Sequence, residues 1–596
     1  MTIAGTDIMT DKSEEGVSLL ALCAREAETD IGNGRRLRHR FGADILSIAK
    51  IGWHGFDGLR WREDEDGSVV RPLAHKTAEQ IRFECTEIMV EEGEALLIEA
   101  GDDAEAEMGK RGRPGPDAGP EAKRAWAKLE AAVKTRDDIA ERLEKRRQAR
   151  RQFAKSSCNS AKLDNMLKEA QPYLSRTVDT MNSDAMALNC RNGTVRFVKV
   201  EDEESCPEDP RYRWAARLDA HRRQDFITKL CEAEFFAPTS GPSGPEAATP
   251  GPALLSEAEL DVMAHQLAPT FIEFLHRVQP DLRMRAYLRR LAGYMLTGLT
   301  GEQVIAFFYG IGANGKSTFT DVVGKILSDY AVTLGIESFT GDVRRGGADA
   351  TPDLARLNGA YACFASEGDE TARLKEGLIK LLTGDDKIAV RKLHQDFVEI
   401  TIKAKFVITG NHKPIIRGDD DGIWRRVHLF EWPVQIPAAE RDRSLPDKLL
   451  AERNGILAWM IAGALEYLTL DGLHPPDELL TAVQEHREDS DPVGAFVRGG
   501  CEVTGEPGDR VTPGEMHEAY IRFSQREGLT PYGAATFNRR LPDKAKQAWK
   551  SPDGRMRQFV RMKSGGTVYA GIRIKDAFRG GPDLGAPIGR EFAPRD

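Results

Sequence analysis

Residues 310–317 constrain this chain more than any other stretch of it. They read Gly-Ile-Gly-Ala-Asn-Gly-Lys-Ser and match the pattern G-x-x-x-x-G-K-[ST] at every position. The apolar run from Val304 to Tyr309 predicts a buried strand that ends at Gly310, and apolar residues at helical spacing after Lys316 predict a helix. A chance glycine-rich turn would lack these flanks. Strand, loop and helix together predict a phosphate-binding site in an α/β fold.

Each residue type in this loop has a chemical role. Glycines let the backbone turn tightly and bring its N–H groups against phosphate oxygens at the positive end of the helix. Lys316 places a charge near the β- and γ-phosphates, and the Ser317 hydroxyl can take one coordination position of Mg²⁺. We therefore predict nucleotide contacts from Gly310, Ile311, Gly312, Ala313, Asn314, Gly315, Lys316, Ser317 and Thr318.

A second apolar run, Ala360 to Ala365, ends in Ser-Glu-Gly-Asp-Glu. We expect it to be the strand beside the phosphate-loop strand. Glu367, the first acid beyond the run, would then hold the Mg²⁺ shell and polarise the attacking water. Asp369 or Glu370 would supply a second carboxylate. An ordinary cluster of surface acids is the alternative interpretation.

A third apolar run begins at Phe406 and ends in the amide Asn411, which we expect near the γ-phosphate, where it would orient water. Two consecutive arginines follow, Arg425 and Arg426, on a predicted exposed turn or strand start. An arginine that reaches across a subunit interface can neutralise charge on a transferred phosphoryl group. Without such a context, paired arginines are usually only surface residues.

Residues between the second and third strands predict a DNA contact. A helix is predicted over Leu374–Thr383, and a hairpin or loop follows with Arg391, Lys392 and His394 near its tip. Projecting into a ring channel, these side chains would grip successive phosphates of one nucleic-acid strand. A further basic run, Lys145 to Lys155, is either a solvated helix face or a phosphate-contacting surface.

Composition excludes several classes of protein. The formal net charge of −10 argues against a protein that coats nucleic acid through bulk charge, so DNA contacts should be local. The eight cysteines are scattered, which disfavours a zinc ribbon or a disulfide framework. The start of the chain has neither a basic nor an apolar leader segment, and no apolar run approaches the roughly 18 residues of a membrane span. We therefore expect a cytoplasmic protein without a membrane partner.

The order of these motifs resembles the compact motor of superfamily 3 helicases. More closely, it resembles the helicase half of the phage/plasmid-type and poxvirus-type primase-helicases. The resemblance extends to Thr29–Asn33, to Trp53 and Trp61, and to Leu188–Gly193 ahead of the motor. It implies ATP with Mg²⁺, a homo-oligomeric ring that is a hexamer, single-stranded DNA in the ring channel, and unwinding of duplex at a phage, plasmid or prophage replication fork.

The implied fold class is α/β. A P-loop NTPase motor of the AAA+-like superfamily 3 type would follow an α+β N-terminal domain, and helix, helix and β-ribbon over 488–576 predict a C-terminal winged helix. The expected boundaries are an arm at 1–24, the N-terminal domain at 25–236 with a charged helical insertion near 100–155, a linker at 237–252, a helical collar at 253–300, the ATPase core at 301–435, a helical segment at 436–487, the winged helix at 488–576 and a disordered tail at 577–596. Within the insertion, the Gly/Pro-rich stretch 100–120 is expected to be a linker or an exposed segment.

Carried over from the family, Lys316 and Ser317 bind phosphate and metal, Glu367 is the Walker B acid and Asn411 is the sensor. Arg426 is our first choice for the arginine finger, and Arg425 is the second. One departure from the pattern is that Gly368 separates the acids, whereas several relatives in the superfamily have adjacent ones.

The sequence thus predicts an ATP-dependent DNA helicase. The alternative is a replication initiator or DNA-binding protein whose ATPase is an assembly switch without processive unwinding; a small-molecule kinase is disfavoured by the motifs downstream of the loop. Only about 25 residues precede the recognised region, and the acid-x-acid pair Asp64 and Asp66 has no supporting strand, so we expect primer synthesis to come from a separate primase or other replication protein.

Overall fold

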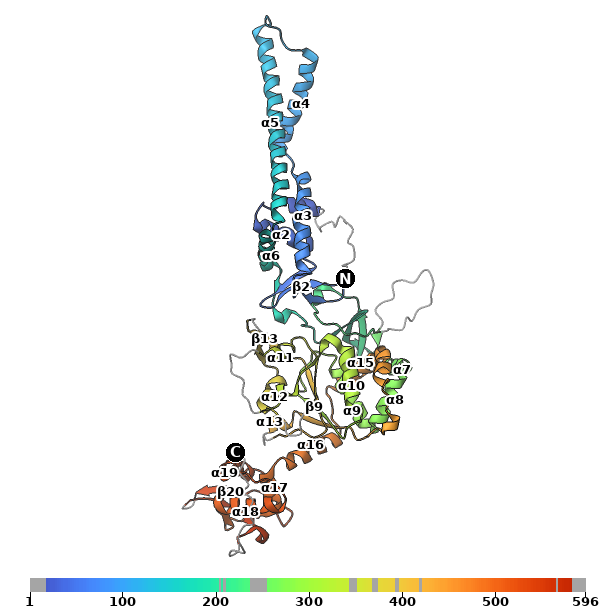
Figure 1. The fold of residues 1–596 in the computed structure, drawn as a ribbon, viewed down its shortest axis with the longest axis vertical. Coiled ribbons are helices and arrows are strands. Elements are labelled where there is room, and N and C mark those ends of the chain that lie inside the picture. The colour runs from blue at the N-terminus through green and yellow to red at the C-terminus, as the bar shows by residue number, and fades with distance from the viewer. Residues whose placement is uncertain are drawn as a thin grey trace. The chain divides into compact units, whose positions relative to one another are not determined.

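The structure of the protein is a computed structural model. It describes residues 18–202, 205–206, 211–235, 254–341, 351–366, 373–391, 396–416, 421–563 and 566–580. The chain divides into two compact units, whose elements are labelled in Figure 1. Unit 1 comprises the described residues within Met1–Arg196, Arg217–Ala253 and Ala389–Ile400, and unit 2 comprises those within Phe197–Ala216, Leu254–Ile388 and Thr401–Asp596.

Unit 1 combines helices with small sheets. One sheet has the order β3-β2-β1-β4, and β5 and β6 form a hairpin at the predicted Asn192-Gly193 turn. The predicted helix start is confirmed, since the Thr29 hydroxyl accepts from the Gly32 N–H at the beginning of α2. The bounds are α1 Leu19–Ala24, α2 Asp30–Phe41, β1 Ile45–Ile48, β2 Gly52–Phe56, β3 Trp61–Glu63, α3 Val70–Gln80, α4 Glu92–Arg111, α5 Pro120–Ser157, α6 Ser160–Leu174, β4 Ser175–Arg176 and β5 Ala187–Cys190. Strands β6 Gly193–Glu201 and β7 Tyr212–Asp219 each have residues in both units.

The charged insertion is a helical hairpin of α4 and α5 (Figure 1). Residues 100–111, which we expected to be linker or exposed segment, continue α4, and only 112–119 lie outside a helix. The two helices approach closely at Gly101, where an added Cβ would lie 2.4 Å from the Arg136 Cβ. The linker interpretation is wrong for residues 100–111, because these residues pack against α5 along one seam, which composition does not reveal.

A buried ion cluster ties the helices of unit 1 together. Glu84 is fully buried, its carboxylate accepts from Arg36 Nε at 3.0 Å, and Arg150 Nη1 lies 2.5 Å from its other oxygen. Arg150 belongs to the basic run at 145–155, so this member of the run stabilises the fold. The idea that the whole run faces DNA is therefore wrong at this position.

We expect Glu84→Gln to destabilise unit 1 strongly, because it removes the charge that pairs with buried Arg36 and one of the two carboxylates that pair with Arg150. Breaking a buried ion pair from one side costs about 3–5 kcal/mol. Hydrogen exchange of peptides from α2 and from Ile81–Glu87 should accelerate accordingly. The matched control is Glu141→Gln, because that carboxylate pairs with Lys145 on an exposed helix face; equal protection in both variants would contradict the prediction.

Unit 2 is built on a parallel five-stranded sheet of order β10-β11-β14-β9-β15. The strands are β9 Ile305–Tyr309, β10 Ala331–Thr333, β11 Ala362–Ser366, β14 Lys405–Thr409 and β15 Val427–Glu431. All are nearly continuous apolar runs, as strands covered on both faces must be. One expectation is wrong: β11 is not the neighbour of the phosphate-loop strand β9, because β14 lies between them.

Helices before and after the sheet pack on one another. Their bounds are α7 Glu257–Leu267, α8 Pro269–Val278, α9 Leu282–Tyr294, α10 Lys316–Leu327, α11 Pro352–Ala355, α12 Glu376–Leu382, α13 Asp421–Trp424, α14 Leu445–Ala451, α15 Arg453–Leu470 and α16 Asp477–Asp489. Helix α15 crosses α9 at two glycines: a Cβ on Gly293 would lie 2.1 Å from Ala464 N, and a Cβ on Gly463 would lie 2.1 Å from Arg289 O. At the same contact Glu466 pairs with both Arg289 and Arg290.

Residues 492–580 of unit 2 have their own core, in which Phe496, Tyr520 and Phe537 pack together. The elements are α17 Pro492–Gly500, β16 Cys501–Val503, β17 Arg510–Val511, α18 Pro513–Arg526, α19 Ala534–Ala545, β18 Trp549–Lys550, β19 Met556–Arg557, β20 Val560–Lys563, β21 Thr567–Ala570 and β22 Ile572–Ile574. Phe578 is buried against Phe523, so the expected tail boundary at 577 is wrong and the folded part extends beyond it.

The other described elements are short: β8 Leu254–Leu255, β12 Lys387–Val390, β13 Val398–Thr401 and the 3₁₀ turns Ile81–Glu87, Val178–Thr180, Arg223–Asp225, Ser328–Tyr330, Ile336–Ser338, Ala438–Glu440 and Asp576–Phe578. Among the described helices, none combines the length and the apolar character that crossing a membrane requires.

Stability of unit 2 should fall in acid because of His428 on β15. This side chain is buried beside the Tyr287 hydroxyl, and burial lowers the pKa of the imidazole to about 4. An unfolded histidine titrates near 6.5. Unfolding therefore takes up a proton as the pH falls from about 6.5 to 4, and the free energy of unfolding should drop by about 3 kcal/mol over that window. Urea unfolding at pH 7 and pH 4.5 checks this, with His428→Asn expected to lose much of the pH dependence and His265→Asn, which is exposed, expected to keep it.

Candidate nucleotide-binding site

The predicted functional loops leave the same edge of the sheet. Strands β9, β14 and β11 are parallel, so their carboxyl ends at Tyr309, Thr409 and Ser366 face one side. The Gly410 N–H donates to Phe308 O at 2.9 Å, which fixes the start of the sensor loop beside the phosphate loop. Ligands of parallel sheets bind outside the carboxyl ends of the strands.

The phosphate loop adopts a backbone that only certain residues tolerate. Gly310 has φ of 140° and Gly315 has φ of 88°. An added Cβ on Gly310 would lie 2.5 Å from Trp432 O, and one on Gly315 would lie 2.8 Å from Val278 and 2.9 Å from Phe274. These glycines are therefore required by both the turn and the close neighbours of the loop.

Lys316 lies inside the cradle that this loop forms. Its side chain is 5% exposed, its Nζ donates to Gly310 O at 2.5 Å, and burial lowers the pKa of the amine. The Ser317 hydroxyl lies in the first turn of the twelve-residue helix α10 and is exposed at the open side. Glycine backbone, a sequestered amine and a helix N-terminus are the groups that bind a polyphosphate with its Mg²⁺.

The segment that follows β15 holds the loop in place. Asn314 is 2% exposed, and its Nδ2 donates to Trp432 O at 3.2 Å. The Ile436 N–H donates to Ala313 O at 2.8 Å, and the Trp432 N–H donates to Tyr309 O at 2.8 Å. Residues 432–436 therefore form a strap across the phosphate loop, and Asn314 is the side chain that fastens it.

A cavity of about 400 Å³ adjoins the loop. It lies between α8, the start of α10 and the segment after the strap, and Ala313, Gly315 and Thr318 form part of its wall. Phe274, Ile436 and Leu445 contribute apolar side chains. This volume is in the range of small-molecule sites, and the mixture of apolar wall and charged rim suits a nucleoside.

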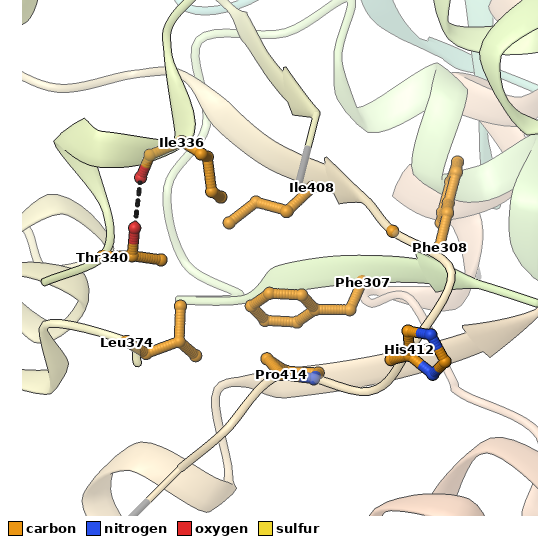
Figure 2. A pocket seen from close by; sticks show the side chains of 9 residues that line it. Phe307, Phe308, Ile336, Thr340, Leu374, Ile408, His412 and Pro414 are labelled. Carbon is orange, nitrogen blue, oxygen red and sulfur yellow. Dashed lines mark hydrogen bonds between the residues drawn. The ribbon is translucent and has the colours of Figure 1, made fainter. Parts of the chain in front are cut away.

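A second cavity lies on a face of the same sheet and is unsuited to a ligand (Figure 2). Phe307, Ile408 and Leu374 point into it, and the Thr340 hydroxyl donates to Ile336 O at 3.0 Å at its margin. Its volume is only about 10 Å³, which is the size of a packing defect rather than of a nucleotide site.

The predicted catalytic carboxylate and part of the predicted DNA contact lie outside the described residues: these are Glu367, Asp369 and Glu370, together with Lys392 and His394. Asn411 is described and lies exposed just beyond β14, at the edge where the phosphate loop begins. Arg391 follows β12, and its guanidinium lies 5.0 Å from the Phe397 ring. Strands β12 and β13 pair in a two-stranded sheet, and residues 392–395 between them lie outside the described residues.

The two arginines differ sharply in exposure. Arg426 is 8% exposed and donates to Thr383 Oγ1 at 3.1 Å, Gly422 O at 2.5 Å and Gln303 Oε1 at 3.1 Å. Arg425 is exposed and touches only the edge of this network, at 3.3 Å from Gln303 Oε1. The burial of Arg426 argues against our preference for it as an arginine finger, because the side chain of such a finger must extend from its own subunit to the nucleotide of a neighbouring one.

Both arginines precede β15, which runs parallel to β9, so they lie at the amino edge of the sheet. The phosphate loop leaves the opposite edge, a strand length of roughly 15 Å away. Arg425 therefore faces away from the phosphate loop of its own chain.

Sequence reasoning missed the strap and the cavity wall. No sequence motif includes Trp432, Ile436 or Phe274. These residues approach the loop only because segments that are distant in the sequence contact one another. In the sequence, only Gly315 and Asn314 indicated that another segment packs closely against the phosphate loop.

Comparison with known proteins finds two family matches along the chain. The family described as D5 N terminal like matches residues 34–280, and a family of unknown function matches residues 308–426. A protein of Acanthamoeba polyphaga mimivirus, named as a candidate helicase, is 33% identical over 157 residues, which is 26% of this chain and 16% of that protein. These matches support a relationship of the chain to D5-like primase-helicases.

Other relatives of this D5-like protein extend the pattern. A protein of African swine fever virus, named as a candidate primase, is 26% identical over 163 residues, covering 27% of this chain and 17% of its own length. The matched region thus spans about a sixth of both viral proteins. Among solved structures, the apo A form of the NrS-1 C-terminal region overlaps 60% of this chain and 93% of that chain, at 12% identity and a TM-score of 0.33.

Asn314→Ala in this D5-like protein should weaken nucleotide binding. The change removes the donor to Trp432 O and frees the loop from the strap, and an unsatisfied buried acceptor costs about 1–3 kcal/mol. Because the loop must then be ordered by the ligand, we expect about ten-fold weaker binding of a fluorescent ATP analogue. Asn358→Ala, a half-buried asparagine away from the loop, is the matched control, and equal affinity in both variants would disprove the role of Asn314.

Proposed function

We propose that this chain is an ATP-dependent DNA helicase of the superfamily 3 type, acting as a hexameric ring in the replication of a phage, plasmid or prophage. The observation that carries the proposal is the shared edge of the sheet, where the phosphate loop and Asn411 lie on adjacent strands and the residue before Glu367 ends the next strand. The names of the viral relatives, helicase and primase, support an activity on nucleic acid.

In the proposed reaction, the loop backbone and Lys316 bind the β- and γ-phosphates of ATP. Ser317 and Glu367 would hold Mg²⁺, which supplies charge neutralisation on the phosphate oxygens. Glu367 accepts the proton of the attacking water, and Asn411 orients that water. The buried position of Lys316 excludes bulk water from the charge that it provides.

Ring assembly would complete each site. Arg425 lies at the edge opposite its own phosphate loop, and in a ring this edge of one subunit can face the nucleotide of the next. We therefore place Arg425 in the role of the finger and give Arg426 the role of fixing the turn that presents it, through Thr383 and Gln303. The proposal makes hydrolysis depend on a neighbouring subunit.

Arg391, Lys392 and His394 would contact single-stranded DNA in the channel, as the hairpin of β12 and β13 supports. A replication initiator that uses ATP only as an assembly switch shares the same nucleotide site. The two functions differ in output, because the switch would bind DNA and hydrolyse ATP without opening a fork.

The decisive experiment measures ATP hydrolysis with and without single-stranded DNA, together with unwinding of a forked duplex. We expect Lys316→Ala to abolish both activities by removing phosphate binding. Arg425→Ala should lower the hydrolysis rate at least a hundred-fold while ATP still binds, since an arginine finger contributes about 10³–10⁵ in rate. Hydrolysis without opening of any fork would establish the switch instead of the helicase.

Subunit mixing tests the finger in trans. Rings that contain both Lys316→Ala and Arg425→Ala chains form some interfaces with an intact loop facing an intact arginine, so hydrolysis should partly return. The matched control is Arg283→Ala, an exposed arginine of α9 paired with Glu478, which should hydrolyse ATP normally. No recovery on mixing would rule out Arg425 as a finger in trans.

A further inference from the structure

One strand of the C-terminal region exposes every side chain. Strand β20 is the edge of the sheet β17-β21-β20, and all four of its residues are exposed. Val560 is 52% exposed and Met562 41%, and they alternate with Arg561 and Lys563. Met556, on the preceding strand, is 65% exposed. Apolar side chains gathered on an exposed edge strand are unusual, because such edges invite pairing and are normally charged.

The surroundings of this strand are strongly basic, although the whole chain carries a net charge of −10. In residues 534–563, Asp543 and Asp553 are the only acids. The basic residues there are Arg539, Arg540, Lys544, Lys546, Lys550, Arg555, Arg557, Arg561 and Lys563. Some are used internally: Lys544 is buried against Asp491, and Arg557 pairs with Asp553. The exposed remainder forms a local positive surface.

The strand is held close to the end of helix α19. Gln558 Nε2 donates to Lys546 O at 3.0 Å, and Val560 pairs with Ala570 on β21. Phe559, directly before the strand, is fully buried in the core of this region. The exposed side chains therefore project from a fixed support.

The mixture of side chains distinguishes possible partners. The outer surface of a continuous duplex presents phosphates, which require basic residues alone. Where a duplex ends or forks, the terminal base pair also exposes a flat apolar face, and aliphatic side chains such as methionine can pack against bases. Strand β20, on which exposed Val560 and Met562 alternate with Arg561 and Lys563, offers both kinds of contact.

We propose that β20 and Met556 form a fork-contacting edge: Val560, Met562 and Met556 pack against the terminal base pair of a duplex, while Arg561, Lys563 and Lys550 contact the flanking phosphates. The inference rests on the proposed helicase function and specifies how the C-terminal region would recognise the fork. It places the apolar contact where strands separate.

The test uses full-length protein carrying Lys316→Ala, so that DNA binding is measured without hydrolysis. Fluorescence anisotropy compares a forked duplex with a closed circular duplex that has no ends. Val560→Ser with Met562→Ser should weaken fork binding about ten-fold and leave circular binding unchanged. Arg561→Gln with Lys563→Gln should weaken binding to both DNAs and lower the salt slope by about one for each residue.

The matched control is Leu282→Ser, which removes an apolar side chain of α9 that is 72% exposed, more than Val560 or Met562; its fork preference should persist. The proposal is overturned if the Val560 and Met562 variant keeps full fork preference, or if it loses fork and circular DNA equally. It is also overturned if that variant changes the oligomer mass in sedimentation, because the edge is then a contact between copies of the chain. If the chain is not a helicase but the fork-contacting edge is real, the ATP hydrolysis and unwinding assays would fail while these DNA-binding results would still be obtained.

Discussion

The parallel pairing of β9 between β14 and β15 is the constraint on which the candidate site depends. One register places Phe308 beside Thr409 and Phe430, and it thereby brings the phosphate loop, the sensor loop and the strap to a common edge. The same register sends the arginines that precede β15 to the other edge. A slip of this pairing would separate the groups that must converge on one phosphate, because register fixes every residue of a strand at once.

The loop itself is completed by two other parts of the chain, one before it in the sequence and one, at Trp432, 118 residues from Asn314. Gly315 packs against α8, and Asn314 fastens residues 432–436. Helix α8 is in turn capped by Glu452, the residue before α15, whose carboxylate accepts from the Thr270 and Phe271 N–H groups in the first turn of α8. The phosphate loop is therefore connected through α8 to the helix that follows the sheet.

Prediction from sequence succeeded where the signal is local and failed where it depends on pairing. Short-range residue types were enough to predict the strand that ends at Tyr309, the turn after it and the helix that begins at Lys316. The place of β11 in the sheet could not be predicted, because it depends on which strands pair. The burial of Arg426 could not be predicted either, because two adjacent arginines look the same in the sequence until the fold places one of them beside Gln303 and Thr383. The seam of α4 and α5 was hidden in a composition that resembles an exposed linker.

The segment between the sensor and the arginines is bound by helix α16, and this bears on how output would follow hydrolysis. His486 Nε2 lies 2.8 Å from Pro414 O, and Arg487 pairs with Asp421 at 2.5 Å. Asn411 and Arg425 flank that segment, and its described residues Pro414 and Asp421 are joined to α16 by these two directional contacts. Chain continuity then leads from α16 through α17 into the region that carries β20. In the proposed helicase, the groups that sense the γ-phosphate and the groups that meet the fork are thus joined by one short helix.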